Sequence, residues 1–326
     1  SDESRMFLGK IKNTVHSKPI DICLSLYETT HNREYLEKAW SFDQQNKASI
    51  LTVNIQEAIW KNDKNSNELV QKHCDENPDL KGILVHLSET STGVKHDVKS
   101  IAQMASRLKD CLTLVDAVTA VGVFEIPMDR WGMDVVVGGS QKGLMMPPGL
   151  SFGVASEKAW RRSESVKSVR YYLDWRKEKK AALENTGAFT SAVTLVGGLL
   201  EVLRYFEKTG HKNIFSRNWK MTFATREAAK AMGLGLLVKN DAHVSAACTS
   251  LLVDGSYPGK IRDRYGFTIS GGQDELKGKI VRIGHMGYLD AWDVLNQLIA
   301  VARVAEKDFG LKLNLNAGLE AFWNVI

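Results

Sequence analysis

The sequence predicts an α/β fold with a mainly parallel sheet flanked by helices, followed by a smaller α+β region. From about residue 50 to residue 155, short β-branched apolar runs alternate with helical patterns, which is typical of a parallel sheet covered by helices. Beyond about residue 210, strands and helices follow one another without that regular alternation. The 326 residues, 44% hydrophobic and 25% charged, are enough for a large buried core.

Five strands and two helices are predicted in the first half. The helices are amphipathic and cover Asn65–Cys74 and Val98–Lys109. Pro147-Pro148-Gly149 leaves too few residues before the last strand for a parallel crossover, so we expect the last two strands to be antiparallel. The strands are Ile50–Val53, Gly82–Leu87, Leu112–Asp116, Asp134–Val137 and Leu150–Ala155.

The second half begins with a strongly apolar segment. Ala192–Phe206 is apolar on most faces and precedes Gly210, which predicts a long buried helix with a glycine stop. We expect a diverged or truncated N-terminal segment (1–45), in which Thr29–Lys38 is at best a polar helix, a large α/β domain (46–208) and a small α+β domain (209–326). The further elements expected are the helices Thr222–Met232 and Ala291–Asp308 and the strands Ser245–Val253 and Lys279–Ile283.

Charge and cysteine content exclude several classes of protein. The net charge of +5 is spread along the chain, and its densest basic runs carry no interleaved aromatics, so we expect no nucleic-acid partner. The four cysteines lie far apart, without metal-ligand spacing, which predicts neither a disulfide framework nor a metal site. We expect no membrane partner and a cytoplasmic location, and we leave an organellar location open.

Lys142 is the first candidate for chemistry. It lies in Gly139-Ser140-Gln141-Lys142-Gly143, between an apolar strand and a Pro-Pro-Gly turn. A lysine held in such a tight loop is partly desolvated, so its amine gives up a proton more readily and becomes nucleophilic. An imine-forming lysine is therefore one interpretation, and an ordinary solvated lysine is the other.

Two further charged residues and a polar turn belong with Lys142. Asp116 ends a strand, where ligands bind in open α/β sheets, although it could equally cap the following segment. The turn Ser88–Gly93 follows another strand and should face the same crevice. Arg282 is embedded in an apolar strand and needs an anionic partner, either a structural carboxylate or a substrate carboxylate.

Four motifs occur in an order that resembles the class V aminotransferases, which are pyridoxal-phosphate enzymes of fold type I. The likeness is greatest to the alanine/serine-glyoxylate aminotransferase group and runs from about residue 50 to the C-terminus. The motifs are Glu89-Thr90-Ser91-Thr92-Gly93-Val94, Val115-Asp116-Ala117-Val118, Gly139-Ser140-Gln141-Lys142-Gly143-Leu144 with Pro147-Pro148-Gly149-Leu150, and Arg282-Ile283-Gly284-His285-Met286-Gly287.

The resemblance implies roles at the cofactor. Lys142 would form an imine with pyridoxal phosphate and later move a proton at the substrate α-carbon. Asp116 would pair with the protonated pyridine nitrogen, and Val118 would pack under the ring. Ser91 would hydrogen-bond near the phenolic oxygen, and Gln141 would help to hold the phosphate.

The resemblance also implies a substrate clamp and a shared site. Arg282 would bind the substrate carboxylate and so select the α-bond that breaks. Thr190 would reach the phosphate in the neighbouring subunit, which implies a homodimer with shared active sites. The alternative for Thr190 is a helix N-cap before Ala192, and both readings could hold together.

The implied reaction is transamination between serine or alanine and glyoxylate or a similar 2-oxo acid. No small-residue phosphate loop is recognisable in residues 1–80, so the alternative is a non-catalytic or cofactor-impaired homologue acting as an oligomeric or partner subunit. Trp40 is near the spacing of a ring-stacking aromatic, but we interpret it as a core or surface residue. Cys248 lies in an apolar strand, which disfavours a cysteine desulfurase, and we interpret His285 as structural.

Overall fold

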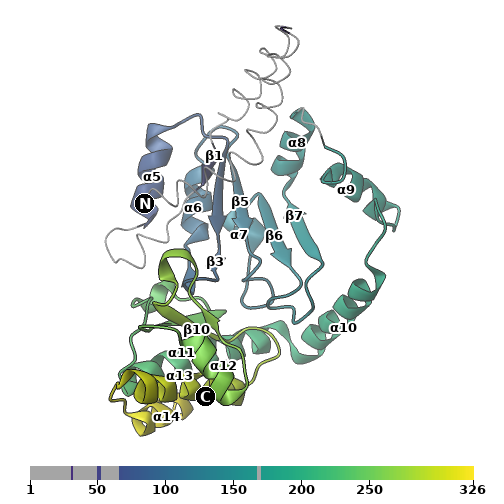
Figure 1. Cartoon of the computed structure of the whole chain (residues 1–326). Coiled ribbons are helices and arrows are strands. Elements are labelled where there is room, and N and C mark those ends of the chain that lie inside the picture. Colours follow the sequence, from purple (N-terminus) through teal and green to yellow (C-terminus); the bar gives the residue numbers. More distant parts are fainter. Residues whose placement is uncertain (1–30, 32–49, 53–65, 167–169) are drawn as a thin grey trace.

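The computed structural model describes residue 31 and residues 50–52, 66–166 and 170–326. Figure 1 shows a sheet with helices around it and, against one end of that sheet, a second lobe formed by the C-terminal part of the chain. The predicted α/β class is therefore confirmed. The expected N-terminal segment, its polar helix and Trp40 lie outside the described residues.

A five-stranded sheet forms the larger lobe, in the order β1-β2-β5-β6-β7. Each neighbouring pair is parallel except β6 and β7, which are antiparallel as the Pro-Pro-Gly turn predicts. The parallel strands run toward the same edge, where His86 of β2 lies opposite Asp116 of β5. The strands are β1 (Ile50–Thr52), β2 (Gly82–His86), β5 (Leu112–Asp116), β6 (Val135–Gly139) and β7 (Ser151–Ala155).

Two of the predicted helices cover this sheet. The helices are α5 (Ser66–Glu76) and α6 (Val98–Ala105), and a short α7 (Met128–Trp131) precedes β6. The Asp97 side chain caps α6 by accepting a hydrogen bond from the Ser100 N–H. Between β2 and α6, a small hairpin of β3 (Ser88–Glu89) and β4 (Val94–Lys95) carries the polar turn.

The helices α8 (Glu157–Ser165), α9 (Trp175–Leu183) and α10 (Val193–Thr209) follow one another along the side of the molecule away from α5 (Figure 1). The prediction of a helix here is confirmed, but the prediction that it is buried is wrong. Phe206 is the one buried residue of α10, and the side chains of Val193, Val196, Leu200 and Leu203 are 49–75% exposed. Its apolar face is therefore left open within the single chain.

The C-terminal lobe packs helices on a three-stranded antiparallel sheet of order β8-β10-β9. Its first helix, α11 (His211–Met232), begins well before the predicted Thr222 and ends at Gly233 in a left-handed conformation. The proposed boundary near residue 208 falls where α10 meets α11, and the division into domains stays a prediction. The other elements are β8 (Cys248–Leu252), α12 (Tyr257–Tyr265), β9 (Ser270–Gly271), β10 (Ile280–Gly284), α13 (Ala291–Phe309), α14 (Leu315–Trp323) and the short 3-10 turns Asp241–His243 and Asp274–Leu276.

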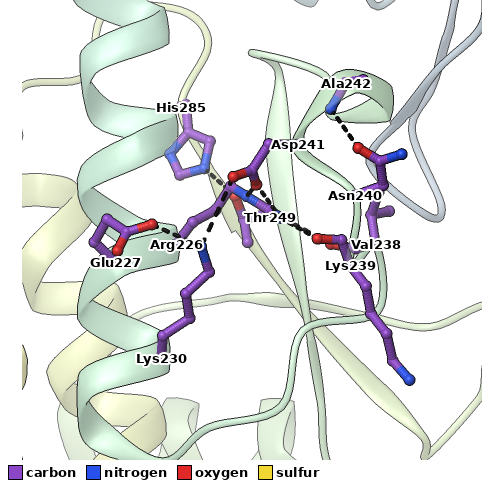
Figure 2. Close-up of polar contacts among 10 residues, drawn as sticks. All are labelled: Arg226, Glu227, Lys230, Val238, Lys239, Asn240, Asp241, Ala242, Thr249 and His285. Carbon is purple, nitrogen blue, oxygen red and sulfur yellow. Dashed lines mark hydrogen bonds and ion pairs between the residues drawn. The ribbon is translucent and has the colours of Figure 1, made fainter.

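Two buried polar groups fix this lobe internally (Figure 2). Arg226, 2% exposed, donates to Asp241 Oδ1 at 2.7 Å and to the carbonyl oxygens of Val238 and Lys239 at 2.9 and 3.3 Å. His285 is fully buried, and its Nε2 shares a 2.9 Å hydrogen bond with Thr249 Oγ1. Arg226 thus finds its partners within the fold, whereas the Nδ1 atom of the buried His285 has no hydrogen-bond partner in the described structure. In the described part of the chain, no helix is long and apolar enough to cross a membrane.

Candidate active site

A cavity of about 550 Å³ lies between the carboxyl edge of the large sheet and the small sheet of the C-terminal lobe. Strand ends and turns of the first lobe supply one wall, and β8, β9, β10 and the segments beside them supply the other. This is the crevice that the strand-end positions predict. Its lining residues are His86, Ser88, Glu89, Thr90, Asp116, Val118, Thr119, Lys142, Cys248, Thr268, Ile269, Ser270, Gln273, Arg282, Gly284, Met286 and Gln297.

The loop after β6 holds Lys142 at this cavity. Ser140 is fully buried, and its hydroxyl donates to the Pro147 carbonyl at 2.7 Å and accepts from the Leu150 N–H at 3.3 Å. On the other side of Lys142, a Cβ at Gly143 would lie 2.3 Å from the Val121 carbonyl oxygen. Only glycine permits this approach, so the backbone is fixed on both sides of Lys142 while its side chain lines the cavity.

Asp116 has one carboxylate oxygen held by the backbone and one facing a histidine. Its Oδ1 accepts a 2.9 Å hydrogen bond from the Val118 N–H, so the capping interpretation is correct. Its Oδ2 lies 3.6 Å from His86 Nε2, and Asp116 and Val118 both line the cavity. Capping and exposure to a ligand therefore occur together.

His86 was not singled out by the sequence, and Glu89 was named only within a motif and given no role, although both line the cavity. His86 Nδ1 lies 4.0 Å from Glu89 Oε2. Glu89 Oε1 accepts hydrogen bonds from the Ser91 N–H and hydroxyl at 2.8 and 2.7 Å. The available signal was position, because His86 ends a strand at the same sheet edge as Asp116.

Arg282 reaches the cavity from β10 and is bonded there to two backbone carbonyls. Its Nε donates to the Gly271 carbonyl at 2.9 Å and its Nη1 to the Thr90 carbonyl at 3.0 Å. Over residues 66–166 and 170–326, no Asp or Glu lies within ion-pair distance of this guanidinium. The described residues therefore supply no structural carboxylate for Arg282, and the guanidinium can bind an anion in the cavity.

Three of the expected residues do not line the cavity. Ser91 directs its hydroxyl to Glu89. Gln141 is exposed, and its side chain folds over Gly139, where a Cβ would lie 2.7 Å from Gln141 Oε1. Thr190 is exposed before α10, and the N-cap of that helix is Ala192 without a side-chain hydrogen bond, so the N-cap interpretation of Thr190 is wrong.

Cys248 lines the cavity as a fixed, protonated thiol. It is 5% exposed at the start of β8, and its Sγ donates to the Thr90 carbonyl at 3.5 Å. Burial raises the pKa of this thiol to about 11. A nucleophilic thiol needs a low pKa and mobility, so the structure agrees with the argument against a cysteine desulfurase.

The groups around the cavity fit pyridoxal phosphate. An amine (Lys142) can bind an aldehyde, a carboxylate (Asp116) can pair with a protonated ring nitrogen, and Val118 offers an apolar surface for a ring. Within the described residues, no group of three or more His, Cys, Asp or Glu side chains could hold a metal ion.

The sequence pattern of the family described as aminotransferase class V matches residues 40–275. The chain therefore belongs to the class V aminotransferases, which are pyridoxal-phosphate-dependent enzymes, as the four motifs indicate. Its relatives and structural neighbours agree with this membership.

Two relatives and one solved structure are similar to this chain in sequence or in fold. The chain is 38% identical over 273 residues to the soluble hydrogenase 42 kDa subunit of Anabaena cylindrica, covering 82% of this chain and 70% of that protein. It is 31% identical over 287 residues to the serine–glyoxylate aminotransferase of Arabidopsis thaliana, covering 86% and 71%. The pyridoxamine-pyruvate aminotransferase structure from Mesorhizobium loti matches with a TM-score of 0.73 and 27% identity, over 79% of this chain and 68% of that one.

Proposed function

We propose that this aminotransferase moves the amino group of a small amino acid, serine or alanine, to glyoxylate or a similar 2-oxo acid. The observation that carries the proposal is the convergence of Lys142, Asp116 and Arg282 on one cavity. The names of relatives support the acceptor, since the Arabidopsis protein is a serine–glyoxylate enzyme and a relative from Paracoccus denitrificans, 30% identical, is an L-aspartate–glyoxylate aminotransferase.

Each residue has a distinct task in the proposed reaction. Bound pyridoxal phosphate supplies an electron sink and carries the amino group between the two half-reactions. Lys142 binds the cofactor and, once the substrate amine takes its place, moves a proton at the substrate α-carbon. Asp116 pairs with the ring nitrogen, Val118 packs under the ring, and Arg282 orients the substrate carboxylate.

We propose that Gln141 helps to hold the phosphate and that Ser91 hydrogen-bonds near the phenolic oxygen. Gln141 and Ser91 lie beside residues that line the cavity, since Gln141 folds over Gly139 next to Val118 and Ser91 bonds to Glu89. Thr190 faces outward on this chain, which suits a role in the site of a second copy.

The test is the absorption spectrum of the purified protein with added pyridoxal phosphate. We expect a visible band that Lys142→Ala removes, and borohydride reduction should fix the cofactor to the peptide that contains Lys142. Lys99→Ala, at an exposed position of α6, is the matched control and should leave the band unchanged. A band that survives Lys142→Ala would overturn the assignment.

A second candidate is a partner subunit with little or no catalysis. The observation that favours it is that two relatives, 38% and 40% identical, are named as subunits of a soluble hydrogenase. This candidate predicts no cofactor band and no amino transfer from serine or alanine to glyoxylate. The same spectrum and an assay of glyoxylate-dependent amino transfer therefore separate the two candidates.

We also propose that the chain forms a homodimer through α10. Its exposed apolar residues Val193, Val196, Leu200 and Leu203 follow a 3-4-3 spacing, which places them on one face of the helix. An apolar stripe of this kind marks a protein interface. Thr190 precedes the same helix, so a second copy docked there would place Thr190 at the interface between the copies.

A charge placed on the stripe should separate the copies. We expect Leu200→Asp to convert a dimer to a monomer in sedimentation equilibrium, because the carboxylate would be buried against apolar side chains. Leu311→Asp, at an equally exposed leucine after α13, is the control and should remain dimeric. A wild-type monomer at micromolar concentration would contradict the proposed dimer.

A further inference from the structure

Three ionisable side chains form a row along the cavity wall: Asp116, His86 and Glu89. The imidazole of His86 lies between the two carboxylates, with Nε2 3.6 Å from Asp116 and Nδ1 4.0 Å from Glu89. Both carboxylates are anchored on their far side, Asp116 by the Val118 N–H and Glu89 by Ser91. The row is therefore held at both ends, and His86 is its centre.

The position of His86 follows from the sheet. His86 and Asp116 are the last residues of two adjacent parallel strands and lie directly opposite one another. Their side chains leave the sheet at the same level, so the distance between them is set by the backbone ladder. An imidazole at this point lies within ion-pair distance of both carboxylates, with one nitrogen facing Asp116 and the other facing Glu89.

The other groups near His86 do not take over this role. His96 is its neighbouring imidazole, and His96 is buried with no hydrogen-bond partner for either ring nitrogen in the described structure. Burial, followed by the proximity of His86 and His243, lowers the pKa of His96 to about 4, so His96 is neutral near pH 7. Lys142 and Arg282 line the same cavity and supply its fixed cations.

We propose that His86 is a positioning residue for Asp116. It holds the Oδ2 side of the carboxylate toward the ring nitrogen of the cofactor, and Glu89 keeps the imidazole oriented for that contact. The inference rests on the proposed function, because it requires pyridoxal phosphate beside Asp116. It goes beyond that function because it gives His86 and Glu89 a role in strengthening the contact between Asp116 and the ring nitrogen.

The test compares binding of pyridoxal phosphate with its 1-deaza analogue, in which a C–H group replaces the ring nitrogen. The two compounds share the aldehyde and the phosphate, so the ratio of their dissociation constants isolates the Asp116 contact. Equilibrium dialysis gives both constants without turnover. We expect wild type to prefer pyridoxal phosphate and His86→Leu to reduce this preference roughly 3- to 5-fold, as for loss of one partly exposed ion pair.

Rescue and control variants distinguish the positioning of Asp116 by His86 from a general loosening of the cavity wall. His86→Gln retains an amide that can donate to Asp116 and should recover part of the preference. His73→Leu, at an exposed histidine of α5, should leave the ratio at the wild-type value. General loosening of the cavity would weaken both compounds equally and leave the ratio unchanged.

The outcomes separate this inference from the proposed function. If wild type binds neither compound, the proposed function fails and takes the inference with it. If wild type prefers pyridoxal phosphate but His86→Leu keeps the preference within twofold, the positioning role alone is overturned. If His86→Leu does not fold, Glu89→Gln decides the matter, since a lowered preference supports the row and an unchanged one overturns it.

Discussion

Arg226 and Arg282 are both arginines embedded among apolar residues of the C-terminal lobe, but they are satisfied differently. Arg226 has a carboxylate partner in Asp241 and two backbone carbonyl partners (Figure 2). Arg282 has two backbone carbonyls and, within the described residues, no carboxylate. The first arginine has its counter-ion within the fold, and the second has none among the described residues.

The histidines His285 and His86 show the same contrast. His285 is fully buried, bonded to Thr249, and its pKa is lowered to about 3 by burial, so it is neutral. His86 has a side chain that is 45% exposed, and it lies between two carboxylates on the cavity wall. The comparison teaches that residue type does not separate structure from function here. The separation comes from whether the side chain lines the cavity, as Arg282 and His86 do, or is enclosed by the fold, as Arg226 and His285 are.

Arg282→Met should give the largest effect in this comparison. Loss of the guanidinium removes the carboxylate clamp, so we expect kcat/KM for the amino donor to fall by roughly 100- to 1000-fold. The free energy of unfolding should change by only about 1 kcal/mol, since two bonds to backbone carbonyls are lost. Steady-state kinetics with serine and alanine, and urea unfolding of the same preparations, measure both quantities.

Arg282→Lys is the matched control for charge. It keeps a cation but loses the two-pronged geometry, so its kcat/KM should lie between those of wild type and Arg282→Met. An unchanged kcat/KM in Arg282→Met would show that another group binds the substrate carboxylate. The contrast with Arg226 would then no longer identify function.

Arg226→Met should have the opposite profile. The substitution leaves the Val238 and Lys239 carbonyls without their donor, and we expect the free energy of unfolding to fall by about 2–4 kcal/mol. Cofactor affinity of the folded fraction should stay at the wild-type value. Arg303→Met, at an exposed arginine of α13, is the control and should change stability by less than about 0.5 kcal/mol. An equal loss of unfolding free energy in Arg226→Met and Arg303→Met would contradict a structural role for Arg226.

Much of the fold and part of the site could be predicted from the sequence because the relevant signals are local. Alternating apolar runs identified the strands, and the short Pro-Pro-Gly connection identified the antiparallel pair. The cavity residues Lys142, Asp116 and Arg282 were found from unusual settings, a small-residue loop, a strand end and a charge inside an apolar strand. Each of these settings is visible within a few residues.

The rest depends on contacts that are distant in the sequence. His86 is unremarkable until strand pairing places it opposite Asp116, 30 residues later in the chain. The apolar character of α10 was read as burial, but composition does not say whether the covering surface belongs to the same chain. The carbonyl partners of Arg282 lie in a turn and a strand that only the tertiary structure brings together.

His285→Gln should give the smallest effect at neutral pH and reveal itself in acid. The pKa of His285 is about 3 in the fold, against 6.5 for an unperturbed histidine, so folding is opposed once the unfolded chain takes up a proton. The neutral, buried His285 therefore stabilises the fold fully above pH 6.5, and this contribution to the free energy of unfolding is lost as the pH falls toward 3. One such histidine costs about 2 kcal/mol of unfolding free energy between pH 7 and pH 5.

The expected result is a smaller loss of stability in acid for His285→Gln than for wild type. Glutamine can still bond to Thr249 but does not titrate, so the difference between pH 7 and pH 5 should shrink by about 2 kcal/mol in urea unfolding. The remaining acid sensitivity should come largely from His96, whose pKa is also lowered by burial. His73→Gln, at an exposed histidine, should follow the wild-type pH dependence. If His285→Gln did so too, His285 would be accessible to protons in the fold, and its contrast with His86 would fail.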